Sequence, residues 1–138
     1  MKITSDEIIK AQAALTSSHI VKSNNRYDGK FAGYISSFAA SLTQSGLLAT
    51  VIAYENTDSQ AEKRPQVIPA LKSMLEIETE SLALYLLLPV GQNDQLKYAN
   101  DPQFIARVER AMVALKIALR LYKKVDNNDN QNTQNNAE

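Results

Sequence analysis

The 138-residue sequence has no cysteine, no tryptophan, a single histidine, and only four glycines and four prolines. Without cysteine the chain can form no disulfide, no thiolate metal site and no cysteine nucleophile. The same absence suits a reducing compartment. The length predicts one domain, large enough to bury a core without covalent cross-links.

Long apolar runs are also missing. The longest run, "LALYLLLPV" at residues 82–90, is far shorter than the roughly 20 residues that span a bilayer. The first ten residues, "MKITSDEIIK", place two acids where a signal peptide would have its apolar region. We therefore expect a soluble, cytoplasmic protein.

Neither sign of charge is in excess, because 15 basic residues balance 15 acidic ones. A chain with zero net charge has no overall field that would attract nucleic acid. Any role in binding nucleic acid must therefore depend on local clusters of bases.

Strand signals are scarce. The sequence has no convincing alternation of apolar and polar residues over a strand length and no hairpin dipeptide between apolar runs. We predict an all-α fold: a single compact bundle of about five to six helices over residues 1–125, with a long C-terminal helix. Residues 126–138, "DNNDNQNTQNNAE", predict a disordered tail, since they offer almost nothing to bury.

Helix boundaries follow from capping signals. Ser5, followed by two acids, predicts the N-cap of a first helix that reaches about residue 22. A second helix is expected from residue 25 or 26. Asp101 followed by Pro102 predicts the start of the last helix, which should run to about Val125.

The sharpest break in the helical pattern lies in "SGLLATVIAYE", residues 45–55. One apolar face ends before Gly46 and a new one begins after it, so Gly46 predicts a helix end or a sharp bend that lets the two faces close on each other. Gly29 and Gly33, earlier in the second helix, are expected where a neighbouring backbone packs closely. The face before the break comprises Tyr27, Phe31, Tyr34, Ile35, Phe38 and Leu42.

Signals of catalysis are weak. His19 has no acid cluster beside it, so we interpret it as a structural or surface histidine. Glu76 and Glu80 have the spacing to share a helix face, which leaves open a divalent-cation site as the alternative to a solvated face. The sequence has no phosphate-binding glycine loop and no nucleophile elbow. We predict no catalytic residue, no metal and no cofactor.

Bases gather in two clusters with helical spacing. Rows of bases at this spacing can track phosphates, whereas the plainer interpretation is a solvated face, because cations also favour helix C-termini. The first cluster is Lys22, Arg26 and Lys30; the second is Lys116, Arg120 and Lys123, with Lys124 beside them.

The last helix is expected to be apolar on two sides. Val113, Ile117 and Leu121 form a second stripe nearly opposite the main one, which predicts a helix that is central in the bundle or covered by a partner. The main face comprises Phe104, Val108, Met112, Leu115, Leu119 and Tyr122.

The run "RYDGKFAGYISSFAASLTQSGLLATVIAYEN", residues 26–56, resembles the small helical subunit of the type III-B CRISPR effector, the Cmr complex. The shared features are a basic residue and a tyrosine opening a helix, an apolar face, and "GLL" leading into an apolar helix. The ending "ALKIALRLYKK" is similar to the basic end of the family's long C-terminal helix.

The resemblance implies a non-catalytic subunit of an RNA-guided, RNA-targeting complex in antiviral defence. Its partners would be the backbone subunits, copies of itself, and the guide and target RNA. On this resemblance, the seven bases become candidate contacts to RNA phosphates, and Val113, Ile117 and Leu121 a candidate subunit interface. The alternative is a helical adaptor that binds only protein.

Overall fold

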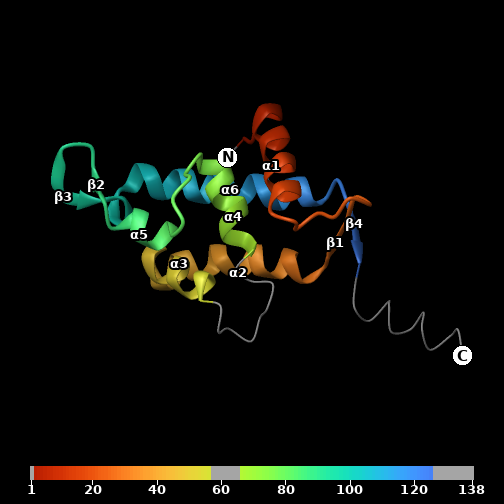
Figure 1. The fold of residues 1–138 in the computed structure, drawn as a ribbon, viewed down its shortest axis with the longest axis horizontal. Helices are drawn as coiled ribbons and strands as arrows, with labels where there is room; N and C mark the ends of the chain where they lie inside the picture. Colours follow the sequence, from red (N-terminus) through yellow and green to blue (C-terminus); the bar gives the residue numbers. More distant parts are fainter. Residues whose placement is uncertain (1, 57–65, 126–138) are drawn as a thin grey trace, which may run out of the picture.

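The computed structural model describes residues 2–56 and 66–125 (Figure 1). Over these ranges the chain is mostly helical, which confirms the predicted all-α class. The predicted tail, residues 126–138, lies outside the described residues. The elements in chain order are α1 (Ser5–Ser17), β1 (Arg26–Asp28), α2 (Lys30–Ser45), α3 (Leu47–Glu55), α4 (Val67–Leu75), α5 (Leu82–Leu86), β2 (Pro89–Val90), β3 (Asn93–Lys97), the 3₁₀-helix Tyr98–Asn100, α6 (Pro102–Leu119) and β4 (Lys123–Val125).

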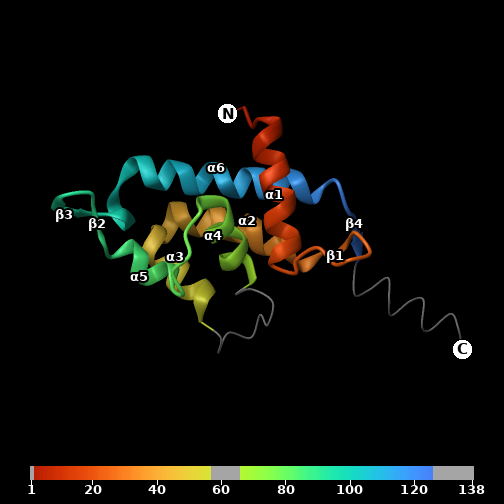
Figure 2. The ribbon, with the colours of Figure 1, turned by 45° about the horizontal axis from the view of Figure 1, so that its top comes forward.

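The long helix α6 organises the bundle. Figures 1 and 2 show α6 along the length of the molecule, with α1 crossing it and with α2 and α3 on its other side. Helices α1, α2 and α4 all contact α6. Because these three helices pack on α6 and α3 packs on α2 and α4, one continuous core forms, in which Leu15, Phe38, Val51, Leu71 and Leu115 are fully buried.

The start of α6 is as predicted. The Asp101 side chain accepts a hydrogen bond from the backbone N–H of Gln103, and Pro102 occupies the first turn. The predicted end is wrong, because α6 stops at Leu119 and residues 123–125 form β4. The predicted face is nonetheless buried as far as Leu119, since the helical spacing is kept up to that point.

The predicted bend at Gly46 is confirmed. Gly46 ends α2 by donating its N–H to the carbonyl of Leu42, and α3 begins at the next residue. Its φ of 86° and ψ of 169° are accessible almost only to glycine. The bend folds α3 back on α2: the rings of Phe38 and Tyr54 meet edge to face at 5.0 Å, and the Tyr54 hydroxyl donates to the Tyr34 carbonyl at 2.6 Å.

Helix α1 differs from its prediction at both ends. Thr4, not Ser5, is the N-cap, and it forms a capping box with Glu7. The helix ends at Ser17 instead of near residue 22, because the chain turns through a left-handed His19, with a φ of 64°, and buries Ile20 and Val21.

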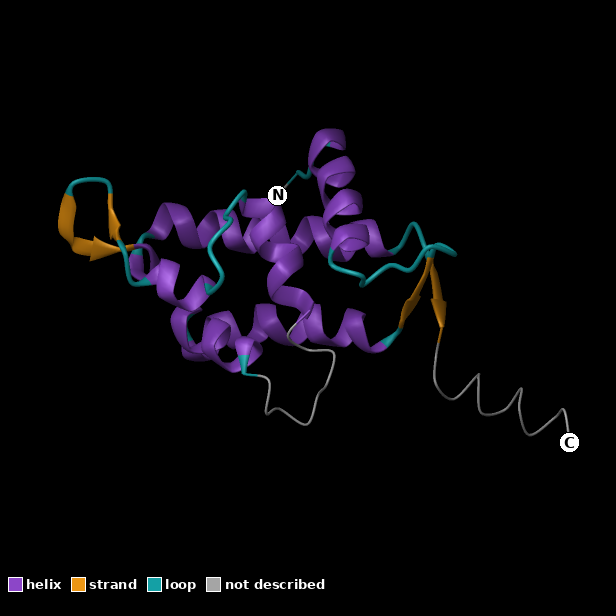
Figure 3. Cartoon of the chain, viewed as in Figure 1, coloured by secondary structure: helices purple, strands orange, loops and turns teal. Residues whose placement is uncertain are grey.

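The close packing predicted at Gly33 is wrong, because a Cβ built there would meet nothing within 4 Å. No hairpin was predicted, yet β2 and β3 form an antiparallel hairpin before α6, and Gly91 between them has a φ of 57°. Figure 3 shows this hairpin at one end of the molecule and the pair β1–β4 at the other.

Candidate nucleic-acid interface

The strands β1 and β4 bring the two clusters of bases together. They pair in parallel, with Arg26 opposite Lys123 and Tyr27 opposite Lys124. The predicted helical rows are therefore wrong, because Arg26 and Lys123 both lie on strands, and Arg120 is the C-cap of α6. The prediction identified the clusters, and the fold brings them to one end of the molecule, with Arg26 and Lys123 on one face of the strand pair and Lys124 on the face of Tyr27.

A tight turn places Lys22 beside this strand pair. The backbone N–H of Asn25 donates to the Lys22 carbonyl at 2.9 Å, and the N–H of Lys22 donates to the Arg26 carbonyl at 2.9 Å. Asn25 adopts a left-handed backbone with a φ of 59°, which asparagine tolerates well. Val21 then bridges to Tyr27 across the turn, so the segment before β1 is held as a small antiparallel loop.

Alternation along β1 decides which side chains face solvent. Successive residues of a strand point to opposite faces. The Tyr27 side chain is buried in the core, as predicted, and Arg26 is exposed. Further backbone bonds join the segments: Lys123 donates its N–H to the Asn25 carbonyl at 3.2 Å, and Gly29 donates to the Val125 carbonyl at 2.9 Å.

We call this end of the molecule the basic corner. All its members are exposed, and they lie on β1, β4, the turn before β1, the start of α2 or the last turn of α6 and its cap. The members are Lys22, Arg26, Lys30, Lys116, Arg120, Lys123 and Lys124.

The charge of the chain is strongly segregated. Residues 22–30 hold three bases and one acid, Asp28, and residues 116–125 hold four bases and no acid. The remainder of the chain is left with eight bases against fourteen acids. A chain of zero net charge thus has a local positive surface, and such a surface attracts polyanions by focusing the field locally.

Arg26 and Lys123 are like charges directly opposite each other on paired strands. Such pairs destabilise a sheet, and charge pairs at exposed positions contribute at most about 1 kcal/mol. Within residues 2–56 and 66–125, neither side chain has an ion-pair partner. An anion placed between them would remove this repulsion, so the arrangement favours a negatively charged ligand.

The candidate catalytic and metal residues do not assemble. His19 is exposed on its turn, and no group of three or more histidines and acids that could hold a metal occurs among the described residues. Glu76 and Glu80 do not share a helix face, because α4 ends at Leu75 and Glu76 adopts a left-handed backbone. Glu76 instead forms a surface ion pair with Lys10 at 3.1 Å.

The second apolar stripe of α6 is solvent-exposed. Val113 and Ile117 are 38% and 37% exposed, and Leu121, two residues beyond the helix, is 62% exposed. A groove of about 400 Å³ between α2 and α6 adjoins the stripe at Val113 and is bordered by Glu109 and Lys116. The stripe is therefore free to meet a partner.

A second exposed apolar group was missed by the sequence reasoning. Leu84 in α5, and Leu87 and Leu88 just after it, are 68%, 50% and 48% exposed. They belong to the longest apolar run of the sequence, and their spacing of three and four residues is the signal that could have identified them as one face.

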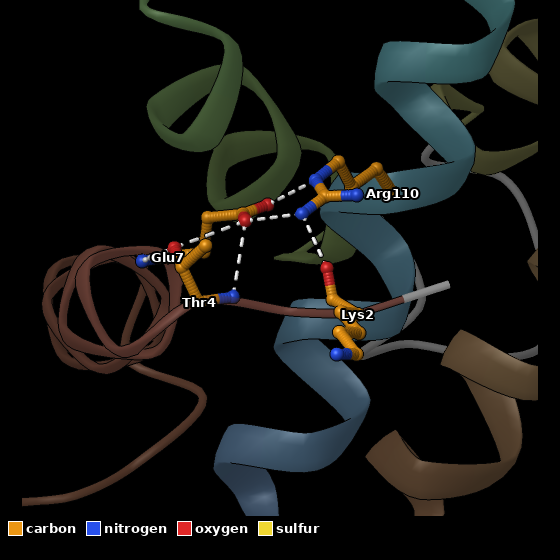
Figure 4. Close-up of polar contacts among 4 residues, drawn as sticks. All are labelled: Lys2, Thr4, Glu7 and Arg110. Atoms are coloured by element: carbon orange, nitrogen blue, oxygen red, sulfur yellow. Dashed lines mark hydrogen bonds and ion pairs between the residues drawn. The ribbon is translucent and has the colours of Figure 1, made fainter.

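Two polar clusters that hold helices in place were also missed. The Glu55 carboxylate accepts hydrogen bonds from the Ser81 hydroxyl and from the N–H groups of Leu82 and Ala83, so it caps the start of α5. The Arg110 guanidinium of α6 binds the Glu7 carboxylate of α1 through two N–H groups (Figure 4). No local spacing reveals either cluster, because the partners are far apart in sequence.

The Glu7–Arg110 pair has a clear electrostatic consequence. The hydrogen bond from Arg110, followed by the one from the Thr4 backbone, lowers the pKa of Glu7 from 4.5 to about 2. The same contact raises the pKa of Arg110. With α1 docked on α6, Glu7 therefore stays ionised down to a lower pH than an ordinary glutamate.

Comparisons with protein families, with curated proteins and with solved structures find no match for this chain. Among the described helices, none is both long and apolar enough to cross a membrane.

Proposed function

We propose that this chain is a non-catalytic, RNA-binding small subunit of a type III-B CRISPR complex, the RNA-guided, RNA-targeting Cmr assembly of antiviral defence. The basic corner carries the RNA-binding part of this proposal, because seven exposed bases from two distant segments share one end of the molecule. The resemblance of residues 26–56 carries the assignment to the Cmr complex.

The corner's chemistry suits the phosphate backbone. Lysine and arginine on strands and helix ends contact phosphate oxygens and position a protein on RNA without reading its bases. In a guided complex, base pairing between guide and target supplies the sequence information. Each copy of the subunit would bind weakly, and several copies along one duplex would together bind tightly.

Such a subunit works in the cytoplasm beside the backbone subunits and copies of itself. The exposed stripe Val113, Ile117 and Leu121 supports contacts of this kind, since exposed apolar residues that adjoin a groove mark interaction surfaces.

Reconstitution tests the proposal. The chain is mixed with Cmr backbone subunits and guide RNA, with and without target RNA. The assembly is separated by size-exclusion chromatography, and its mass is measured. Entry of several copies is expected. A parallel binding assay uses the triple substitution Lys22→Glu, Arg26→Glu and Lys123→Glu, which should remove RNA binding while the helical circular-dichroism signal stays unchanged. RNA binding that survives this triple substitution contradicts the role of the corner.

The second candidate function is a helical adaptor that binds only protein, and the exposed apolar residues on α5 and α6 favour it. Two sets of substitutions distinguish the two functions. Charge reversal in the basic corner abolishes RNA binding by the RNA-binding subunit and leaves an adaptor unaffected, whereas Ile117→Glu with Leu121→Glu disrupts protein binding by the adaptor.

A further inference from the structure

A second group of bases lies away from the basic corner, in a small pocket where α1, α4 and α6 meet. The pocket has a volume of about 200 Å³, and Lys10, Arg107, Arg110 and Glu7 provide its polar wall. Its apolar wall consists of Met74, Leu75 and Ala111, which are all buried. Only the fold brings these residues together, since they come from three separate helices.

Arg110 is fixed in this pocket by the protein itself. Its Nε donates to Glu7 Oε2 at 2.5 Å, and its Nη2 donates to Glu7 Oε1 at 2.6 Å and to the carbonyl of Lys2. A guanidinium carries five N–H groups, of which two belong to Nη1. Figure 4 draws no contact from this third nitrogen, and Nη1 has no hydrogen-bond partner within the described part of the chain. Arg110 can therefore offer two oriented donors without losing its structural contacts.

Glu7 does not cancel the positive charge of the pocket. Three cationic side chains and one carboxylate line it, and with the Glu76 carboxylate that pairs with Lys10 included, an excess of one positive charge is left. The Glu7 oxygens already accept hydrogen bonds from Arg110 and from the N–H and hydroxyl of Thr4. The Glu7 carboxylate is thus already bound by Arg110 and by Thr4 at the start of α1.

Lys10 and Arg107 are available to a ligand. Lys10 pairs with Glu76, but that carboxylate is 77% exposed, and exposed ion pairs are weak enough to exchange. Arg107 lies with the central carbon of its guanidinium 5.8 Å from the centre of the Phe104 ring, and a cation–π contact of this kind uses none of its N–H donors. Three cations from two helices can therefore converge on one small ligand.

We infer that this pocket binds a tetrahedral oxyanion of the phosphate type, held by Lys10 and Arg107 against the fixed guanidinium of Arg110. Arginine and lysine donors match the oxygens of phosphate, and charge-assisted hydrogen bonds of this kind are the strong ones. The volume lies below the roughly 300–1,000 Å³ of pockets for larger organic ligands. The site therefore fits a phosphate group, and any nucleoside attached to that phosphate would lie outside the pocket. Free phosphate and the terminal phosphate of a nucleic acid present the same chemistry.

The inference does not depend on the proposed RNA-binding function, because the pocket and the basic corner share no residue. Either proposal can therefore be wrong while the other holds.

The test is titration of the full chain with inorganic phosphate at constant ionic strength, with chloride as the reference anion. Binding is followed by calorimetry and by the arginine Nε–H signals in NMR spectra. We expect saturable binding with shifts at Arg107 and Arg110, and an affinity at least about tenfold weaker in Arg107→Gln and in Lys10→Gln, since each removes one charge-assisted hydrogen bond. Lys97→Gln, which removes one charge from β3, outside both the pocket and the basic corner, is the matched control and should bind phosphate like the unsubstituted chain.

A pair of dinucleotides with and without a 5′-phosphate identifies the source of the anion. Tighter binding of the 5′-phosphorylated one, lost in Arg107→Gln, assigns the pocket to a nucleic-acid terminus, and equal binding of the two assigns it to free phosphate. The inference is overturned if inorganic phosphate shifts no arginine signal beyond the chloride reference, or if both pocket variants keep full affinity. The NMR arm needs no variant, so it decides the matter even where a substitution impairs folding.

Discussion

Arg26 and Lys123 are opposite each other on the parallel strands β1 and β4, and this pairing brings the two clusters of bases to one end of the molecule. Two like charges at opposed strand positions repel each other and weaken the pair. An anion bound between the two side chains would offset this repulsion. The pairing is therefore the structural basis of the proposed contact with RNA phosphates.

Neutralising this pair should have opposite effects on folding and on binding. In Arg26→Gln with Lys123→Gln, the repulsion is gone, so we expect a free energy of unfolding that is unchanged or higher by at most about 1 kcal/mol. RNA affinity should fall, and the slope of log affinity against log salt should drop by about 0.7 for each lost phosphate contact on single strands. Chemical denaturation and binding at several salt concentrations measure the two effects. An unchanged salt slope argues against phosphate contacts at these residues.

The bend at Gly46 should tolerate no side chain. A Cβ at Gly46 meets nothing within 4 Å, so the cost of Gly46→Ala comes from the backbone alone, whose φ of 86° and ψ of 169° are strained for alanine. We expect a loss of about 1–3 kcal/mol in the free energy of unfolding. Gly33→Ala is the matched control: it lies within α2, also has no atom within 4 Å of its Cβ, and should stabilise by up to about 1 kcal/mol. Equal effects of the two substitutions in urea denaturation contradict the backbone argument.

The Glu7–Arg110 pair predicts a loss of stability in acid. Because the folded pKa of Glu7, about 2, lies below its ordinary value of 4.5, the unfolded state binds the proton more readily. The contribution of Glu7 is therefore fully present above pH 4.5 and is lost as the pH falls toward 2. We expect Glu7→Gln to melt at a lower temperature than the unsubstituted chain at pH 7 and at nearly the same temperature near pH 2. A difference in melting temperature that does not change with pH rules out this linkage.

Glu55 should be needed for the start of α5. Glu55→Ala removes the acceptor for the Ser81 hydroxyl and for two backbone N–H groups, so we expect a loss of about 0.5–2 kcal/mol, as for other helix caps. Hydrogen exchange of the Leu82 and Ala83 amides should accelerate at the same time. Glu76→Gln is the control, since its exposed ion pair with Lys10 contributes little. Unaltered protection of both amides in Glu55→Ala shows that the cap is dispensable.

Local signals in the sequence predicted the helices well. The apolar face of α6 from Phe104 to Leu119, the start of that helix at Asp101 and the bend at Gly46 all follow from helical periodicity, capping chemistry and the freedom of glycine. These features depend on residues within a few positions of one another. Periodicity also separated the exposed stripe Val113 and Ile117 from the buried face.

What the sequence determined by itself was thus the set of helices and the side of each that is buried. The tertiary structure alone decided which surfaces meet. Lys123 lies in a strand because this segment pairs with Arg26, although the local pattern predicted a helix there. Arg110 binds Glu7, 103 positions earlier in the sequence, because α1 packs on α6. Pairings of this kind are fixed by how the whole core closes, so no short stretch of sequence encodes either the basic corner or the oxyanion pocket.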